Sequence, residues 1–255
     1  MRIKVLGCSG AGFPGHNPSG FLLDDRILFD AGSLTNVLQG KDQKKIEYIF
    51  VTHAHLDHVT GIPFLAESII SEKKWHRINV ISIPPVIRTL KKNLLNSSVW
   101  PDFTVIPSVR DRILNLIEMK PGESALVGGY TVTSYRVNHS VPTAGYLIEN
   151  KVKRRVFYTG DTGPSSATWK RLGKMQIHSL IIEVSFPNRM EDMARKTGHL
   201  TPRLLGKELL KINHPPERIY ITHLKPQYIK AIKTELQQLR NKNLRLLRDG
   251  ETIRV

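Results

Sequence analysis

Apolar and polar residues alternate along much of this chain, or apolar residues gather in short runs, and both patterns predict β-strands. The expected strands are 2–7, 20–23, 27–30, 47–52, 78–82, 103–106, 124–127, 130–137, 144–148, 154–159, 179–184 and 218–222. Apolar residues follow helical spacing most clearly at 61–72, 84–96, 165–173, 201–212 and 226–239. Only strands are expected at the start of the chain, and strands and helices are then interspersed in both halves. This order predicts an α/β (α+β) fold with two β-sheets flanked by helices.

Length and composition agree with that architecture. A chain of 255 residues with 40% hydrophobic content can bury a sizeable core, and it fits one layered domain over 1–255 better than two small ones. No run approaches the roughly 20 consecutive apolar residues that span a bilayer, so no membrane partner is expected. The first strand is too short for the apolar part of a signal peptide. Cys8 is the single cysteine, which excludes an internal disulfide framework and is compatible with a cytoplasmic location.

Four side chains able to bind a metal lie within six residues, directly after the apolar run 49–51. They are His53, His55, Asp57 and His58. In an extended or tightly turned segment, residues i and i+2 project to the same side, so the first two histidines can hold one ion. The chain must then turn for the other two to face a second ion. Imidazole and carboxylate together favour zinc, manganese or iron over calcium.

Further candidate ligands follow three of the expected strands. His139 comes after 130–137, Asp161 lies in the turn after 154–159, and His223 comes after 218–222. Side chains delivered by strand ends are what an active site built from loops requires. Each is weak evidence alone, because a lone histidine or a Gly-Asp-Thr-Gly turn is common. Together with the first four residues they complete a ligand set.

From Gly7 to His223 the chain resembles the metallo-β-lactamase superfamily, whose ligand motifs match these seven residues in order. The resemblance implies an αββα sandwich with the site at one edge. It also implies one metal held by His53, His55 and His139, a second held by Asp57, His58 and His223, and Asp161 bridging both. Asp30 matches an early aspartate of the family that follows a strand. We expect it to accept the free N–H of a ligating histidine, although a simple turn role before Gly32 is equally compatible with its position.

Four segments resemble the class II cyclic-nucleotide phosphodiesterases of that superfamily. They are HAHLDHVTGIPF at 53–64, WPDF at 100–103, GHLTP at 198–202 and THLKP at 222–226. The resemblance implies a dinuclear-metal phosphodiesterase, most simply a zinc enzyme, that hydrolyses 3′,5′-cyclic nucleotides to 5′-monophosphates. The candidate catalytic residues are Asp57, His199 and Glu183. His199 is the expected general acid, because histidine can be charged near neutral pH and donate to a departing oxygen.

Glu183 lies where the related tRNA 3′-processing enzymes place the glutamate of a Glu–His pair, so it is expected to orient His199. A structural role for His199 near the start of a helix capped by Thr201 is compatible with this chemistry. The aromatic residues Trp100 and Phe103 fit two interpretations equally well. They either stack on a nucleobase or cover the core.

The charge balance opens an alternative. With 38 Lys and Arg against 22 Asp and Glu, the formal charge is +16, which suits a polyanion such as RNA. A tRNA 3′-processing endonuclease is therefore the alternative function. Those enzymes carry a substrate-grasping arm between the distal-His and bridging-Asp motifs, whereas only 21 residues separate His139 from Asp161 here. A non-catalytic nucleic-acid-binding scaffold is disfavoured by the intact ligand set. The expected partners are a small cyclic nucleotide, or RNA, and a homodimer is compatible with the sequence.

Overall fold

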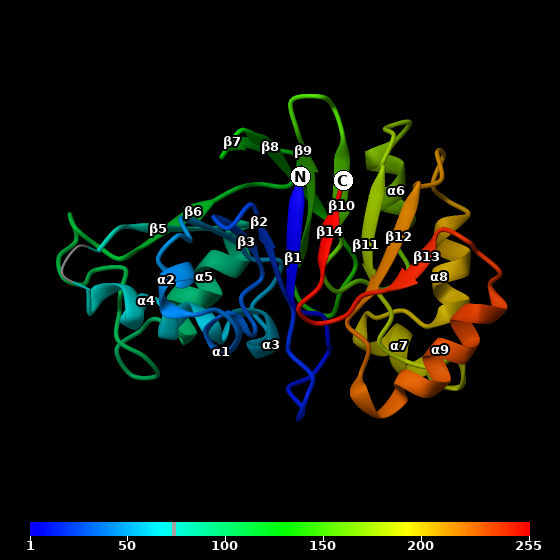
Figure 1. Cartoon of the computed structure of the whole chain (residues 1–255), viewed down its shortest axis with the longest axis horizontal. Coiled ribbons are helices and arrows are strands. Elements are labelled where there is room, and N and C mark those ends of the chain that lie inside the picture. Colours follow the sequence, from blue (N-terminus) through cyan, green and yellow to red (C-terminus); the bar gives the residue numbers. More distant parts are fainter. Residues whose placement is uncertain (73–74) are drawn as a thin grey trace.

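The computed structural model describes residues 1–72 and 75–255, and over these residues the chain forms two seven-stranded sheets. The first sheet contains β1 (Arg2–Gly7), β2 (Gly20–Leu23), β3 (Ile27–Phe29), β4 (Tyr48–Phe50), β5 (Ile78–Ser82), β6 (Leu114–Glu118) and β14 (Thr252–Arg254). Its strand order is β14-β1-β2-β3-β4-β5-β6. The pairs from β3 to β6 are parallel, whereas β14, β1 and β2 pair antiparallel. The first and last strands therefore lie side by side (Figure 1).

The second sheet repeats this division into an antiparallel and a parallel half. It contains β7 (Ser124–Val127), β8 (Tyr130–Arg136), β9 (Ala144–Glu149), β10 (Arg155–Tyr158), β11 (Ser179–Glu183), β12 (Arg218–Thr222) and β13 (Leu244–Leu246). Its order is β13-β12-β11-β10-β9-β8-β7. The strands from β7 to β10 pair antiparallel and those from β10 to β13 pair parallel. Parallel strands end at the same edge, so residues that follow them can meet there.

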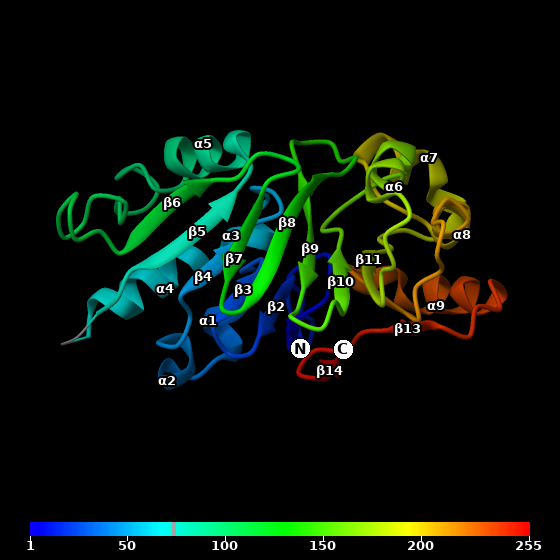
Figure 2. The ribbon, with the colours of Figure 1, turned by 90° about the horizontal axis from the view of Figure 1, so that it is seen from above.

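Helices accompany each sheet. Those of the first half are α1 (Leu34–Val37), α2 (Gly40–Gln43), α3 (Leu56–Val59), α4 (Gly61–Ile70) and α5 (Pro84–Asn93). Those of the second half are α6 (Ser166–Leu172), α7 (Glu191–Thr197), α8 (Pro202–Leu209) and α9 (Ile229–Gln238). Figures 1 and 2 show α1–α5 beside the first sheet and α6–α9 beside the second. This is the two-sheet arrangement flanked by helices that the sequence predicts.

The apolar side chains form two buried clusters. The larger cluster joins the two sheets, and aromatic pairs mark the junction: Phe21 lies 4.9 Å from Tyr158 and Phe50 lies 5.3 Å from Tyr146, measured between ring centroids. The smaller cluster packs the outer face of the second sheet against its helices, with Ile182 as one of its fully buried members. Burying apolar surface on both faces of the second sheet holds the strand ends in place.

Two parts of the expected pattern are wrong. The apolar run 103–106 forms turns rather than a strand, because Phe103 inserts into the larger core cluster, and the strand of this region is β6. The strands β6, β13 and β14 and the helices α1, α2, α3 and α7 were not expected. Among the residues that the structure describes, no helix is long and apolar enough to cross a membrane.

Candidate metal centre

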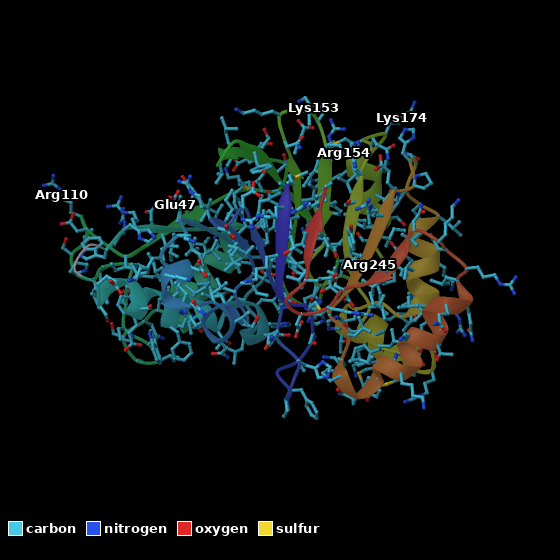
Figure 3. All side chains as sticks on the ribbon, viewed as in Figure 1. Glu47, Arg110, Lys153, Arg154, Lys174 and Arg245 are labelled. Atoms are coloured by element: carbon cyan, nitrogen blue, oxygen red, sulfur yellow. The ribbon has the colours of Figure 1, made fainter. Side chains whose placement is uncertain are left out.

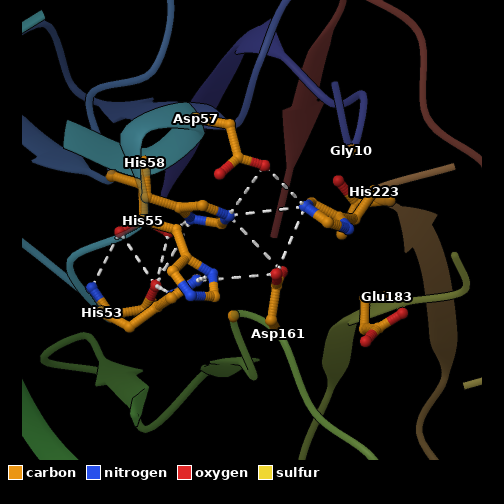
Figure 4. A network of polar contacts seen from close by, with 12 residues as sticks. Gly10, His53, His55, Asp57, His58, Asp161, Glu183 and His223 are labelled. Atoms are coloured by element: carbon orange, nitrogen blue, oxygen red, sulfur yellow. Dashed lines mark hydrogen bonds and ion pairs between the residues drawn. The ribbon is translucent and has the colours of Figure 1, made fainter. Parts of the chain in front are cut away.

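The seven ligands expected from the sequence converge where strands of both sheets end. They are His53 and His55 in the loop after β4, Asp57 and His58 in α3, His139 after β8, Asp161 after β10, and His223 after β12. In Figure 4 the labelled members of this set point toward a common centre from the two halves of the chain. The fold thus brings together every ligand that the resemblance implied.

One group combines three histidines with an aspartate: His53, His55, His139 and Asp161, whose candidate ligand atoms all lie within 4.8 Å of one another. The Nε2 atom of His53 is 3.0 Å from Nδ1 of His55 and 3.6 Å from Oδ2 of Asp161. The Nε2 atom of His139 is 3.5 Å from the same His55 nitrogen. These nitrogens surround one small volume, as the ligands of a single cation do.

A second group lies beside the first and contains Asp57, His58 and His223. The Nε2 atoms of His58 and His223 are 3.4 Å apart, and the latter is 3.3 Å from Oδ2 of Asp57. Asp161 reaches this group as well, with Oδ1 3.5 Å from His58 and Oδ2 3.3 Å from His223. One carboxylate therefore contacts both groups, which is the position that a bridging ligand occupies.

Four of the histidines share one orientation: Nδ1 faces an oxygen outside the centre and Nε2 faces the centre. The Nδ1 partners are Thr52 Oγ1 for His53 at 3.0 Å, Asp30 Oδ2 for His58 at 2.7 Å, Gly198 O for His139 at 2.8 Å, and Ser185 Oγ for His223 at 2.9 Å. The Asp30 carboxylate and the Gly198 carbonyl can only accept, and the hydroxyls of Thr52 and Ser185 already donate to the carboxylates of Asp30 and Glu183, so all four imidazoles donate from Nδ1. The lone pair of Nε2 is then free for a metal.

Asp30 is fully buried and collects several donors, as the sequence interpretation expected. It accepts from Nδ1 of His58, from the backbone N–H of Thr52 at 2.8 Å and from the phenol of Tyr158 at 2.7 Å. Its φ of 56° lies in the left-handed region, where aspartate is one of the tolerated residues. Thr52 and Tyr158 were missed by sequence reasoning. Thr52 directly precedes the His53 motif and was recognisable from that position, whereas Tyr158 reaches across from the other sheet.

Glu183 and His199 form the pair that the resemblance implied. Oε1 of Glu183 accepts from Nδ1 of His199 at 2.6 Å, and Oε2 accepts from the Ser185 hydroxyl at 2.9 Å. Because Ser185 in turn faces Nδ1 of His223, one hydrogen-bonded chain links His199 to a proposed metal ligand. Candidate ligand atoms of His199, Asp161 and His223 lie within 4.8 Å of one another, so His199 borders the centre. The N-cap role of Thr201 is also present, since its side chain accepts from Leu204 N.

Burial sets the protonation of the first group. It lowers the pKa of His53 well below its ordinary value, and it lowers the pKa of His139 too, so both imidazoles are neutral. Burial also opposes charge on His58, but the carboxylates of Asp161 and Asp30 outweigh it and raise the pKa of His58. Burial likewise opposes ionisation of Asp57, yet the hydrogen bond from His223 and the charge of His58 hold its pKa at about 2. The buried carboxylates thus favour a positive charge in their midst.

The loop after β1 closes against His223. A Cβ atom at Gly10 would lie 2.6 Å from the carbonyl oxygen of His223 and 2.7 Å from its Nδ1, so only glycine permits this approach (Figure 4). His223 itself has a φ of 62°, a conformation that costs energy for a residue with a side chain. Its backbone N–H donates to the carbonyl of Cys8 at 2.7 Å. Backbone contacts from the amino-terminal loop therefore fix the orientation of this imidazole.

Three other residues considered from the sequence lie in packing roles. Phe103 is buried in the core, and Trp100 packs edge to face on Phe64 with their ring centroids 4.9 Å apart. Cys8 is buried, and burial, followed by the charge of Asp249, raises the pKa of its thiol far above the ordinary value. A thiol in that state is a poor nucleophile, so the packing interpretation of Cys8 agrees with its surroundings.

The donor set fits two divalent transition metals. The neutral imidazoles of His53 and His139 and the carboxylates of lowered pKa are ready to coordinate without losing protons, whereas His58, whose pKa is raised, would release a proton to a cation. Asp161 is positioned to serve both ions. The two groups are therefore consistent with a dinuclear metal site.

A family model described as "Beta-lactamase superfamily domain" matches residues 25–224. The chain belongs to the metallo-β-lactamase superfamily. Its two intact metal-binding groups agree with that membership.

Three relatives of this metallo-β-lactamase-fold protein carry two different names. The chain is 31% identical over 249 residues to a 3′,5′-cyclic-nucleotide phosphodiesterase of Aliivibrio fischeri, covering 80% of this chain and 73% of the relative. It is 29% identical over 225 residues to a probable 3′,5′-cyclic-nucleotide phosphodiesterase of Yersinia pestis, covering 77% and 64%. It is 31% identical over 194 residues to a ribonuclease Z of Thermococcus kodakarensis, covering 69% and 57%. The chain thus spans less than two thirds of the Yersinia and Thermococcus proteins.

Solved structures agree on the fold. Unliganded yeast PDE1 matches with a TM-score of 0.82 at 19% identity, covering 98% of both chains. The short form of human tRNase Z matches with a TM-score of 0.72 at 19% identity, covering 100% of this chain and 99% of the other. At such identities the likeness establishes the metallo-β-lactamase fold and leaves the substrate to the chemistry of the site.

Proposed function

We propose that this protein is a dinuclear-metal phosphodiesterase that hydrolyses 3′,5′-cyclic nucleotides to 5′-monophosphates. The observation that carries the proposal is the pair of Glu183 and His199, held at 2.6 Å beside Asp161 and His223. A ribose oxygen is a poor leaving group and requires a proton as its bond to phosphorus breaks. A histidine that lies beside a metal centre and is hydrogen-bonded to a carboxylate can donate that proton.

The residues around the centre have different proposed roles. When bound, a pair of divalent cations acidifies water and offsets the negative charge of a phosphoryl group. We assign one cation to His53, His55 and His139 and the other to Asp57, His58 and His223, with Asp161 between them. Zinc fits this mixture of imidazole and carboxylate best, and manganese or iron fits it next. Asp57 has a second, catalytic assignment because its carboxylate is about a quarter exposed, whereas that of Asp161 is buried.

His199 donates its proton from Nε2, since Nδ1 is engaged by Glu183. Burial opposes the charged imidazole, but the charge and hydrogen bond of Glu183 raise the pKa of His199 above its ordinary value. The acid form is therefore available near neutral pH. Glu183 also holds Ser185, so movement of its carboxylate is restricted on both oxygens.

The segment between His139 and Asp161 supports a small substrate over tRNA. Residues 140–160 are occupied by β9, β10 and the turn that joins them as an antiparallel pair, which leaves no length for a grasping arm. A cleft of about 600 Å³ opens beside His139 and is lined by polar groups that include Arg136, Asn138 and Arg171. Its volume is typical of clefts for small molecules, and its lining contains no acidic residue to repel a phosphate.

A tRNA 3′-processing activity is the second candidate, because the net charge of +16 and the ribonuclease Z relative both favour RNA. The decisive experiment incubates metal-loaded protein separately with cyclic AMP, cyclic GMP, a 3′-extended tRNA precursor and bis(p-nitrophenyl) phosphate. Fastest turnover of a cyclic nucleotide, with 5′-monophosphate as the product, is expected. Trimming of the precursor with cyclic nucleotides intact would establish the second candidate. Absence of turnover on all four, with both metals bound, would favour a non-catalytic scaffold.

A further inference from the structure

Two adjoining grooves lie around the edge strand β13, away from the residues assigned to catalysis. The first, of about 790 Å³, runs between β12, β13 and β14, and the second, of about 660 Å³, runs between α9 and β13. They share Lys242, Leu244 and Arg245, so they adjoin each other along β13. None of the proposed metal ligands, nor Glu183 or His199, lines either groove. Arg218 stands at the amino end of β12, whereas His223 follows its carboxyl end.

The lining of these grooves is strongly basic. Its cations are Arg218, Lys233, Arg240, Lys242, Arg245, Arg248 and Arg254. The one acidic residue among the lining residues, Glu217, is already paired with Arg154 at 3.0 Å. Arg245, labelled near β12 in Figure 3, pairs with Glu251 at 2.9 Å and lies over the Tyr220 ring. Within the described residues, the other six lining cations have no carboxylate within 4.0 Å. By contrast, Lys153 at the periphery of the molecule pairs with Glu149 at 2.6 Å (Figure 3).

This arrangement concentrates positive potential where the floor is apolar. Leu236, Leu244 and Leu246 line the second groove beneath its basic rim. Charges of one sign around a concave, low-dielectric floor focus the field and attract anions. Guanidinium groups, which predominate here, bind phosphate oxygens in a bidentate manner. Each groove falls within the range of about 300–1,000 Å³ of ligand clefts, which exceeds the space that one inorganic anion needs.

We propose that the two grooves form a binding site for single-stranded nucleic acid, held through the phosphates of its backbone. The inference goes beyond the proposed catalytic function and does not depend on which phosphodiester is hydrolysed. An acidic peptide added to the edge of the sheet is disfavoured, because β13 has three residues and offers few backbone hydrogen bonds. A strand of nucleic acid presents one negative charge per nucleotide along its length, which is complementary to the seven cations that line the two grooves.

The test measures binding of a fluorescein-labelled oligouridylate 12-mer to the metal-loaded protein by fluorescence anisotropy at several salt concentrations. The groove variant carries Arg240→Gln, Lys242→Gln and Arg248→Gln, none of which forms an ion pair among the described residues. The control variant carries Lys41→Gln, Lys44→Gln and Lys45→Gln in and beside α2, and it removes the same charge elsewhere. We expect the groove variant to lose roughly 10- to 100-fold in affinity near 0.1 M salt. Its salt slope should fall by about 2, because each phosphate contact on a single strand contributes about 0.7.

Two further measurements separate this site from the catalytic centre. Turnover of bis(p-nitrophenyl) phosphate should be the same in parent, groove variant and control, which also shows that the variants fold. Saturating cyclic AMP should leave oligouridylate binding unchanged. If the groove variant misfolds, the pair Lys233→Gln and Arg254→Gln replaces it. The proposal is overturned if groove and control variants lose equal affinity, if cyclic AMP displaces the RNA, or if a poly-glutamate peptide binds the grooves while the RNA does not.

Discussion

The two metal-binding groups are built from similar ligands but have different supports behind them. In the first group no imidazole donates directly to a carboxylate: His53 donates to the Thr52 hydroxyl, which itself donates to Asp30, and His139 donates to the Gly198 carbonyl. Burial lowers the pKa of both imidazoles, so this group presents neutral nitrogens and takes its negative charge from Asp161 alone.

In the second group one imidazole contacts a carboxylate directly. His58 donates to the buried Asp30 carboxylate. His223 donates to the Ser185 hydroxyl, which in turn donates to Glu183. A carboxylate behind an imidazole raises the basicity of the ligating nitrogen and strengthens metal binding. We therefore expect the second group to hold its cation more tightly than the first group does. It also places the proton donor, His199, on the same hydrogen-bonded chain as the second group.

Removing Asp161 should weaken both groups at once, because its carboxylate touches both. We expect Asp161→Ala to lower the metal content from about two equivalents per chain, the number of a two-metal site, and to lower turnover with it. Elemental analysis after exhaustive desalting, paired with activity in the presence of a chelator, measures this. A desalted parent with almost no metal and full activity in chelator would contradict the dinuclear assignment.

His199→Ala should separate chemistry from metal binding. Turnover of a cyclic nucleotide should fall by roughly 10²–10⁴-fold, the usual contribution of a general acid, while metal content stays the same. With bis(p-nitrophenyl) phosphate the loss should shrink sharply, since phenolate leaves without a proton. Glu183→Gln should show the same dependence on the leaving group, and the double variant should lose less than the product of the two single losses.

His223→Ala is the matched control, because it should reduce metal content and turnover together. Equal losses on both substrates for His199→Ala, or loss of metal in that variant, would show that His199 is a ligand or a packing residue and that the proton has another source.

Asp30→Asn should weaken the second group more than the first, because Asp30 contacts His58 directly and reaches His53 only through the Thr52 hydroxyl. The asparagine tolerates the left-handed backbone at this position but lacks the charge behind His58. We expect affinity for one of the two metals to fall by roughly 10- to 100-fold, as measured by competition with a coloured chelator. Thr52→Ser, which keeps the hydroxyl that supports His53, is the conservative comparison and should bind both metals as the parent does. A loss of both metals in Asp30→Asn would argue against the difference between the groups.

Ser185→Ala should give the smallest effect. It removes one hydroxyl between Glu183 and His223 and leaves every proposed ligand in place. A single hydrogen bond of this kind contributes about 0.5–1.5 kcal/mol, so turnover should fall roughly two- to tenfold. Ser185→Thr, which restores a hydroxyl, should recover part of the loss. Unchanged kinetics in Ser185→Ala would mean that the hydrogen bonds of Ser185 to Glu183 and His223 do not contribute to turnover.

Local pattern was sufficient for most strands, for the long helices and for the ligand set. Strands such as β8 and β11 were recognisable because alternation or an apolar run persists over several residues. Where elements are short, this signal disappears: β13 and β14 have three residues each, and α7 buries Ala194 as its one buried residue. The prediction of a strand at 103–106 was wrong for a different reason. This run is apolar enough for a strand, but its Phe103 packs in the larger core cluster.

The sequence by itself determined which side chains meet at the centre, because His53 to His58 are contiguous and the remaining ligands each follow a strand whose end is fixed by sheet topology. Only the tertiary structure decided which residues hold these ligands in place through hydrogen bonds. Tyr158 reaches Asp30 across 128 positions, and Ser185 reaches His223 across 38. Such contacts depend on how the two sheets and the loops above them pack, to within a fraction of an ångström. The physical reason is that a hydrogen bond requires a short, directed approach of two atoms, and no periodicity in the chain encodes that distance.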